Sequence, residues 1–208
     1  MQNIFIIGAG DLGREIEAWF DLYSEDKDKF RIVGYIDDNP NALDGFPSDY
    51  KIVGNICDFE FDKNDWIILA IANPTTREII YRKLLNKANF YTFIPKNVII
   101  GKYVKIEEGS IILPNTVIST NVKIGKCVII NIGTQIGHDV IIDDFCSLMA
   151  NVDIGGSVQL GKKVYIGSNA TIIPKICIVD DVKIGAGSIV IKKIHKSQTV
   201  FGNPAKRI

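Results

Sequence analysis

Two adjacent residues in the middle of the chain, His138 and Asp139, are of the types that acid–base chemistry requires. An imidazole changes charge near neutral pH, so it can accept a proton from an attacking group. A neighbouring carboxylate can fix the ring tautomer and stabilise the imidazolium. A surface histidine without a role is the alternative. The only other histidine, His195, lies near the end of the chain, where a surface position is the simpler reading.

A second candidate site is the segment Gly8-Ala9-Gly10-Asp11-Leu12-Gly13, which follows an apolar run. This GxGxxG spacing is typical of a tight turn that brings backbone N–H groups and a helix N-terminus to a phosphate. Asp37 ends the next apolar run, where an acid can bind a ribose hydroxyl. The motif alone indicates a dinucleotide, but about ninety residues make only half of a dinucleotide fold. We therefore favour a mononucleotide or nucleotide-sugar over a nicotinamide cofactor or a purely structural turn.

The first part of the chain alternates strand-like and helix-like patterns, which predicts a small parallel sheet. Buried strands are expected at residues 3–8, 31–36, 66–72 and 91–94. A helical pattern follows the glycine segment and runs through Ile16, Trp19 and Phe20. A second helix is expected to begin at Pro74, with Asn73 as its cap.

From Ile100 to Val190 every sixth residue is a branched aliphatic, and a small or β-branched residue lies two positions before each. A period of six fits neither an α-helix nor an ordinary strand, so it indicates stacked repeats. Glycine often follows the aliphatic residue, which we attribute to a sharp corner.

This run resembles the hexapeptide-repeat acyltransferases, whose fold is a left-handed parallel β-helix. In that fold three hexapeptides form one triangular coil, so residues eighteen apart stack, and about five coils fit here. A β-helix without catalysis is the alternative.

Stacking by eighteen gives three columns of corner residues. One column alternates in charge and should be a solvated edge: Glu108, Lys126, Asp144, Lys162, Asp180. Another is small and uncharged and should pack against a neighbour or line a cleft: Pro114, Ile132, Ala150, Ser168, Ala186. In the third column Gly156 follows His138 by one coil, which opens space beside the imidazole. β-Helices of this kind usually form trimers, so we expect a cleft between the His138 edge and the uncharged edge of a neighbouring subunit.

The whole chain resembles the PglD/NeuD-like sugar acyltransferases, the nucleotide-amino-sugar N-acetyltransferases and their sialic acid O-acetylating relatives. The segments that carry this resemblance are Ile7–Gly10, Ile36–Asp38, Ala70–Asn73, Ile136–Asp139 and Gly202–Lys206. It implies a Rossmann-like half-domain at 1–93 for the nucleotide-sugar, a left-handed β-helix at 94–192 and a tail at 193–208.

The resemblance also implies roles for individual residues. His138 would be the general base and Asp139 its partner, and backbone N–H groups near Gly156 would stabilise an oxyanion. The substrate-binding residues would be Gly8, Gly10, Asp11, Leu12, Asp37, Asp38, Gly54 and Asn73. The residues near CoA would be Ser147, Gly156, Ser168, Ala186 and Lys206. Many relatives carry a second histidine where this chain has Ser147, so the role of that position is weaker here.

Composition and charge bear on several other classes of protein. Lys and Arg total 24, as do Asp and Glu, so the balance suggests no nucleic-acid partner. No apolar run reaches membrane-spanning length and no signal peptide is evident. The 4 cysteines (Cys57, Cys127, Cys146, Cys177) are scattered, which is typical of reduced thiols in a cytoplasmic protein. A zinc carbonic anhydrase of the same fold would need three histidines, and we expect no metal.

The leading hypothesis is therefore an acetyl-CoA-dependent N-acetyltransferase that acts on a nucleotide-linked 4-amino-4,6-dideoxysugar. The linked nucleotide would be UDP, dTDP or GDP. O-acetylation of sialic acid or another sugar, and a non-catalytic nucleotide-sugar-binding scaffold, are the alternatives.

Overall fold

A computed structural model describes all residues from Met1 to Ile208, and the chain divides into two compact units. The first unit is Met1–Lys96 and the second is Asn97–Ile208. This division falls three residues after the boundary expected at 93/94. Residues 193–208, expected as a tail, lie inside the second unit and contain two strands. Neither helix of the protein is long and apolar enough to cross a lipid bilayer.

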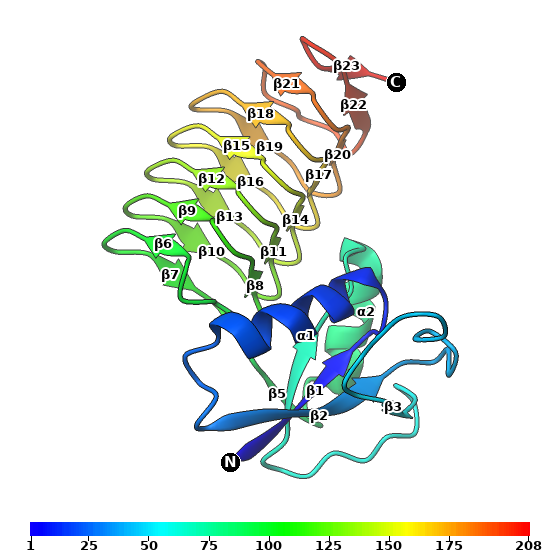
Figure 1. Ribbon diagram of the computed structural model, residues 1–208. Helices are drawn as coiled ribbons and strands as arrows, with labels where there is room; N and C mark the ends of the chain where they lie inside the picture. Colours follow the sequence, from blue (N-terminus) through cyan, green and yellow to red (C-terminus); the bar gives the residue numbers. More distant parts are fainter. The chain divides into compact units, whose positions relative to one another are not determined.

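The first unit is built around one sheet of five parallel strands (Figure 1). The strands are β1 (Gln2–Ile7), β2 (Phe30–Ile36), β3 (Ile52–Gly54), β4 (Trp66–Leu69) and β5 (Asn89–Phe90), in the order β3-β2-β1-β4-β5. The central strands are continuous apolar runs because both faces of a parallel sheet are covered. The strand expected at 91–94 is misplaced, because β5 ends at Phe90 and does not overlap that range. β3 was not predicted, since its three residues are only partly buried.

Two helices connect the strands of this sheet. Helix α1 (Asp11–Tyr23) buries Leu12, Ile16 and Phe20, whose spacing of four residues places them on one face. Helix α2 (Pro74–Leu84) begins as expected, because the side chain of Asn73 accepts the backbone N–H of Thr76 at 3.0 Å.

The second unit is a left-handed parallel β-helix made of two-residue strands (Figure 1). The strands are β6 (Ile99–Ile100), β7 (Lys105–Ile106), β8 (Ile111–Ile112), β9 (Val117–Ile118), β10 (Lys123–Ile124), β11 (Ile129–Ile130), β12 (Gln135–Ile136), β13 (Ile141–Ile142), β14 (Ser147–Leu148), β15 (Asp153–Ile154), β16 (Gln159–Leu160), β17 (Tyr165–Ile166), β18 (Thr171–Ile172), β19 (Cys177–Ile178), β20 (Lys183–Ile184) and β21 (Ile189–Val190). They form three sheets in which each residue pairs with the one eighteen positions away, as Ile124 does with Ile142. The aliphatic residue of each hexapeptide ends its strand and, after the first coil, is buried.

The corners of the β-helix correct one sequence expectation. Residues with positive φ lie three positions after the aliphatic residue, for example Asn121 (φ 58°) and Asp139 (φ 60°), and not directly after it. Asn and Asp tolerate this left-handed conformation better than most residues. The glycines that follow the aliphatic residue are instead required by close packing. A β-carbon on Gly137 would lie 2.7 Å from the backbone N of Gly156, so these glycines permit close approach of neighbouring coils.

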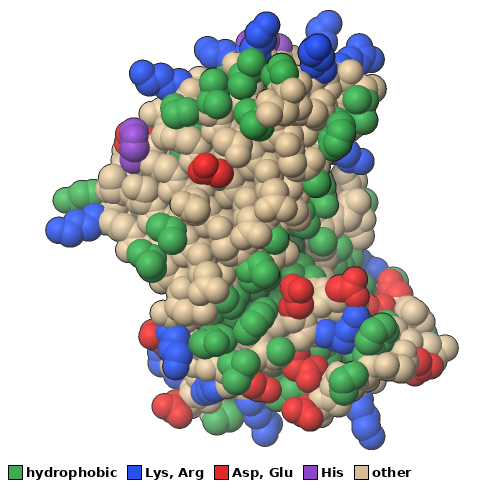
Figure 2. All heavy atoms as spheres, turned by 45° about the horizontal axis from the view of Figure 1, so that its top comes forward, with side chains coloured by type: hydrophobic (Ala, Val, Ile, Leu, Met, Phe, Trp, Pro, Cys, Tyr) green, Lys and Arg blue, Asp and Glu red, His purple; other side chains and the backbone are tan.

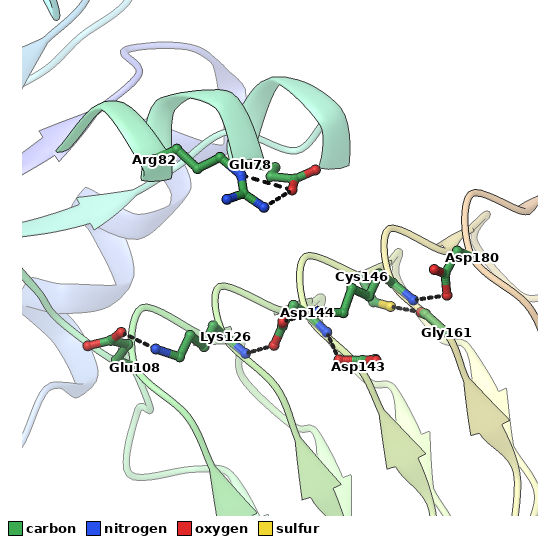
Figure 3. Close-up of polar contacts among 10 residues, drawn as sticks. Glu78, Arg82, Glu108, Lys126, Asp143, Asp144, Cys146, Gly161 and Asp180 are labelled. Carbon is green, nitrogen blue, oxygen red and sulfur yellow. Dashed lines mark hydrogen bonds and ion pairs between the residues drawn. The ribbon is translucent and has the colours of Figure 1, made fainter. Parts of the chain in front are cut away.

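The column of alternating charge is confirmed as a ladder of ion pairs and hydrogen bonds (Figure 3). The ammonium of Lys126 lies 2.8 Å from Glu108, and that of Lys162 lies 3.0 Å from Asp144. Asp144 also accepts the backbone N–H of Lys126 at 2.9 Å. Each carboxylate or ammonium therefore links two neighbouring coils at this edge.

The β-helix ends in a short antiparallel pair, β22 (Thr199–Phe201) and β23 (Lys206–Arg207). β22 pairs with β20 and continues its sheet, and Ile194 forms a single bridge with Ile178. Buried Ile194 and Val200 close the core at this end.

Candidate active site

Three connecting segments meet at the carboxyl edge of the five-stranded sheet. The glycine turn follows β1, Asp37 and Asp38 follow β2, and residues 70–73 follow β4. The strand order runs outward from β1 in both directions, so the edge between β1 and β4 is a topological switch point. Ligands of open parallel sheets bind in the crevice at such a point.

The three glycines of the turn have different surroundings. Gly8 has φ 99°, and a β-carbon there would lie 3.0 Å from the carbonyl oxygen of Ala70. A β-carbon on Gly13 would overlap the carbonyl of Gly8, so this glycine lets α1 pack against the turn. Gly10, the N-cap of α1, has nothing within 4 Å of its β-carbon position. Space for a ligand is therefore open at Gly10.

The paired acids hold the backbone of this edge together. Asp37 accepts the N–H of Ala9 at 2.7 Å through Oδ2 and that of Asn39 at 2.8 Å through Oδ1. Asp38 accepts the N–H of Ile56 at 2.8 Å, and its side chain is otherwise exposed. Asp37 thus ties the glycine turn to the end of β2.

The remaining expected substrate residues lie on the same edge with diverse contacts. Asp11 is exposed and forms an ion pair with Arg14 at 2.5 Å, and Leu12 is buried in the core. The carbonyl of Gly54 accepts the N–H of Asp37 at 3.0 Å. Asn73 is occupied as the cap of α2. Leu12, Gly54 and Asn73 therefore shape this edge through packing and backbone contacts.

His138 lies at a corner of the β-helix between β12 and β13 and is hydrogen-bonded to its neighbour. Its Nδ1 lies 2.7 Å from Oδ2 of Asp139, and its side chain is 61% exposed. When Nδ1 donates to the carboxylate, Nε2 carries the lone pair that a general base needs.

Asn121, which the sequence interpretation missed, completes this group. Its Nδ2 donates to Oδ1 of Asp139 at 2.6 Å. The pKa of Asp139 is lowered, chiefly by the hydrogen bond from Asn121 and then by that from His138. The signal was present in the sequence, because Asn121 precedes Asp139 by eighteen residues and so lies under it.

Gly156 lies one coil beyond His138, against the face of the imidazole. A β-carbon on Gly156 would lie 2.6 Å from Nε2 of His138. The next residue, Ser157, donates its N–H to the carbonyl of His138 at 2.8 Å. Glycine is thus the residue that leaves Nε2 open at this corner.

The other residues expected near CoA are not gathered around His138 within one chain. Ser147, on β14, is completely buried, so its hydroxyl is not open to a ligand in the single chain. Ser168 is half-buried, Ala186 is exposed, and Lys206 is exposed on β23.

A cavity of about 720 Å³ lies away from these sites. Phe59, Phe61, Lys63 and residues 85–89 line it, near the amino ends of β4 and β5. That edge is opposite to the one at which ligands of parallel sheets bind. No group of three or more His, Cys, Asp or Glu residues is arranged to hold a metal ion.

Comparison with known proteins bears on both units. Residues 3–84 match the family model described as the PglD N-terminal domain. Over these residues the chain is similar to that domain. Within the first unit the glycine turn, Asp37 and Asp38 lie together at the switch point of the sheet.

Solved structures match the entire chain, including the β-helix of the second unit. The acetyltransferase domain of PglB from Neisseria gonorrhoeae is 24% identical, with a TM-score of 0.84 and 100% of both chains covered. PerB from Caulobacter crescentus, determined with CoA and GDP-perosamine, is 22% identical, with a TM-score of 0.86 and coverage of 100% and 98%. WeeI from Acinetobacter baumannii is 27% identical, with a TM-score of 0.72 and full coverage of both chains. No curated protein matches the sequence.

Proposed function

We propose that this protein transfers an acetyl group from acetyl-CoA to the amine of a nucleotide-linked 4-amino-4,6-dideoxysugar. The observation that carries the proposal is the hydrogen-bonded pair His138–Asp139 with Nε2 open beside Gly156. The pair lies on a β-helix that follows a unit similar to the PglD N-terminal domain. PerB, which has the same fold, was determined with CoA and an amino sugar carried by GDP.

In the proposed reaction the sugar amine attacks the thioester carbonyl directly. Nε2 of His138 accepts the proton that the nitrogen loses, and Asp139 stabilises the imidazolium. The tetrahedral intermediate then collapses, its C–S bond breaks, and the CoA thiolate leaves and takes up a proton. Backbone N–H groups near Gly156 supply the oxyanion contact.

The first unit would hold the nucleotide at the carboxyl edge of its sheet. Gly10 leaves the backbone open to a phosphate, and the N-terminus of α1 favours negative charge. The exposed carboxylate of Asp38 is available to a ribose hydroxyl.

We further propose a homotrimer in which the uncharged edge, with Ser168 and Ala186, faces the His138 edge of a neighbour. Ile132 of that edge is 38% exposed in the single chain, which is consistent with a partner surface. Lys206 would then contact a phosphate of CoA. A monomeric mass in solution would exclude this arrangement.

The test is release of CoA thiol from acetyl-CoA with a panel of UDP-, dTDP- and GDP-linked amino sugars, and with free sialic acid. We expect turnover with an amino sugar and a loss of at least about a hundredfold in His138→Ala. The matched control is His195→Ala, which removes the chain's other histidine and should keep full turnover. Turnover only with sialic acid would favour O-acetylation. Full activity in His138→Ala would refute the role of the imidazole, and tight binding without any turnover would favour the scaffold.

A further inference from the structure

The neutral overall charge conceals a strong separation along the chain. The first unit contains 16 acidic and 11 basic residues, whereas the second contains 8 acidic and 13 basic residues. The excess in the second unit lies entirely after Asp181. Residues 182–208 contain no Asp or Glu and six basic residues: Lys183, Lys192, Lys193, Lys196, Lys206 and Arg207.

The fold gathers these cations at one end of the β-helix. Lys192 and Lys193 follow β21, which ends its sheet, and Lys196 follows Ile194, whose bridge to β19 extends a second sheet. Lys206 and Arg207 form β23, which ends the third sheet. Basic side chains gather at this end in the space-filling view (Figure 2). We call the surface of residues 191–208 and Lys183 the end face.

The cations of the end face are exposed, and none of them forms an ion pair. Three of the seven lysines between Asn97 and Asp181 are paired with an acid of a neighbouring coil. Lys126 pairs with Glu108, Lys162 with Asp144, and Lys163 with Asp181 at 3.2 Å. Residues 97–181 contain 8 acidic and 7 basic residues, so their charges nearly balance, whereas residues 182–208 contain no acidic side chain. The uncompensated potential of the end face is therefore available to an external anion.

Apolar side chains are exposed among these cations. Ile191 is 42% exposed, Phe201 53% and Ile208 78%. A surface that binds single-stranded nucleic acid combines a basic groove with several aromatic side chains on which bases stack, and Phe201 is the one Phe, Tyr or Trp of the end face. Lysines interspersed with exposed aliphatic and aromatic side chains fit the headgroup layer of a bilayer, which offers phosphates above an apolar interior.

We propose that the end face docks this protein reversibly onto a membrane surface rich in acidic phospholipids. The cations other than Lys206 contact lipid phosphates, and Ile191, Phe201 and Ile208 enter the apolar boundary of the headgroup layer. Because the contact is carried by charged side chains at the surface, the attachment depends on lipid charge and weakens with salt. The proposal stands independently of the acetyl transfer proposed above.

The test measures binding of the full chain to vesicles of phosphatidylcholine alone and of phosphatidylcholine mixed with phosphatidylglycerol. We expect binding only to the phosphatidylglycerol vesicles, and less of it as salt is raised. The triple variant Lys192→Gln, Lys193→Gln, Lys196→Gln should bind on the order of a hundredfold more weakly. The matched control neutralises Lys102, Lys105 and Lys123, three exposed lysines of the early coils, and should bind like the parent. Melting temperatures of both variants establish that they fold.

Several outcomes would overturn the proposal. Equal binding to both kinds of vesicle, or an unchanged affinity in the end-face variant, would exclude the electrostatic contact. If this variant instead raises the KM for acetyl-CoA while vesicle binding is unchanged, the lysines serve the phosphates of free CoA. Competition by double-stranded DNA as effective as that by phosphatidylglycerol vesicles would indicate a general polyanion surface and not a lipid one.

Discussion

Gly156 lies so close to the imidazole of His138 that a single added methyl group would meet Nε2 at 2.6 Å. The two residues are one coil apart, at stacked corners of the same edge. Gly156 has no positive φ, so alanine is compatible with the backbone there and the imidazole must move.

Gly156→Ala should therefore impair chemistry without unfolding the protein. We expect turnover to fall by about ten- to a hundredfold, since a displaced base loses much of its contribution. The melting temperature should change little. In a His138→Ala background the same substitution should cause no further loss, because the two changes act through one imidazole. Additive losses would show that Gly156 acts on something other than His138.

Asn121→Ala should remove the hydrogen bond that orients Asp139 and, through Asp139, the imidazole of His138. Because the hydrogen bond from Asn121 is the main cause of the lowered pKa of Asp139, its loss should raise that pKa. We expect a severalfold decrease in kcat, little change in KM, and an acidic limb of the pH profile that moves to higher pH. Asn169→Ala is the matched control. Both asparagines have φ 58°, so alanine introduces the same backbone strain at either position. Equal effects of the two substitutions would assign the loss to backbone strain.

Asp37→Ala should loosen the glycine turn, because the N–H of Ala9 loses an acceptor at 2.7 Å. We expect nucleotide-sugar affinity to fall by about tenfold or more, the scale of a lost hydrogen bond to a charged group. Titration calorimetry with the best substrate of the panel measures this loss. Asp44→Ala, an exposed acid a few residues further on, should bind like the parent. If both variants bind alike, the tie between Asp37 and the turn does not matter for the ligand.

Asp144→Asn tests the ladder of charge on the β-helix. Burial raises the pKa of Asp144, but the N–H of Lys126 and the ammonium of Lys162 outweigh burial, so the pKa is lowered overall. A carboxyl whose pKa is lowered on folding stabilises the protein above its unfolded pKa, and that stability is lost as pH falls through the folded pKa. At neutral pH the variant should unfold with about 1 kcal/mol less free energy. Denaturant titrations should show this difference vanish at strongly acidic pH. A deficit that persists there would have a non-ionic cause.

The β-helix could be predicted from the sequence because its contacts recur at a fixed offset. Each coil packs on residues eighteen positions away, so the buried aliphatic series, the charge ladder and the Gly156–His138 contact all follow from counting. Asn121 obeys the same rule, since it lies eighteen positions before Asp139 in the column next to that of His138. The role of the corner glycines was misjudged, since close approach of two coils cannot be told from positive φ by residue type alone.

The first unit shows what depends on tertiary structure. The GxGxxG turn and the Asn73 cap follow from local sequence, because both are contacts within a few residues. The hydrogen bond from Ala9 to Asp37 spans 28 positions, and the one from Ser48 to Glu17 spans 31. No sequence repeat in this unit predicts either of them. Such contacts form only when irregular loops return to the sheet. The sequence alone thus determined the repeating core and the neighbouring positions of His138 and Asp139. Packing decided which carboxylates are tied to backbone, which hydroxyl is buried, and where the unpaired cations gather.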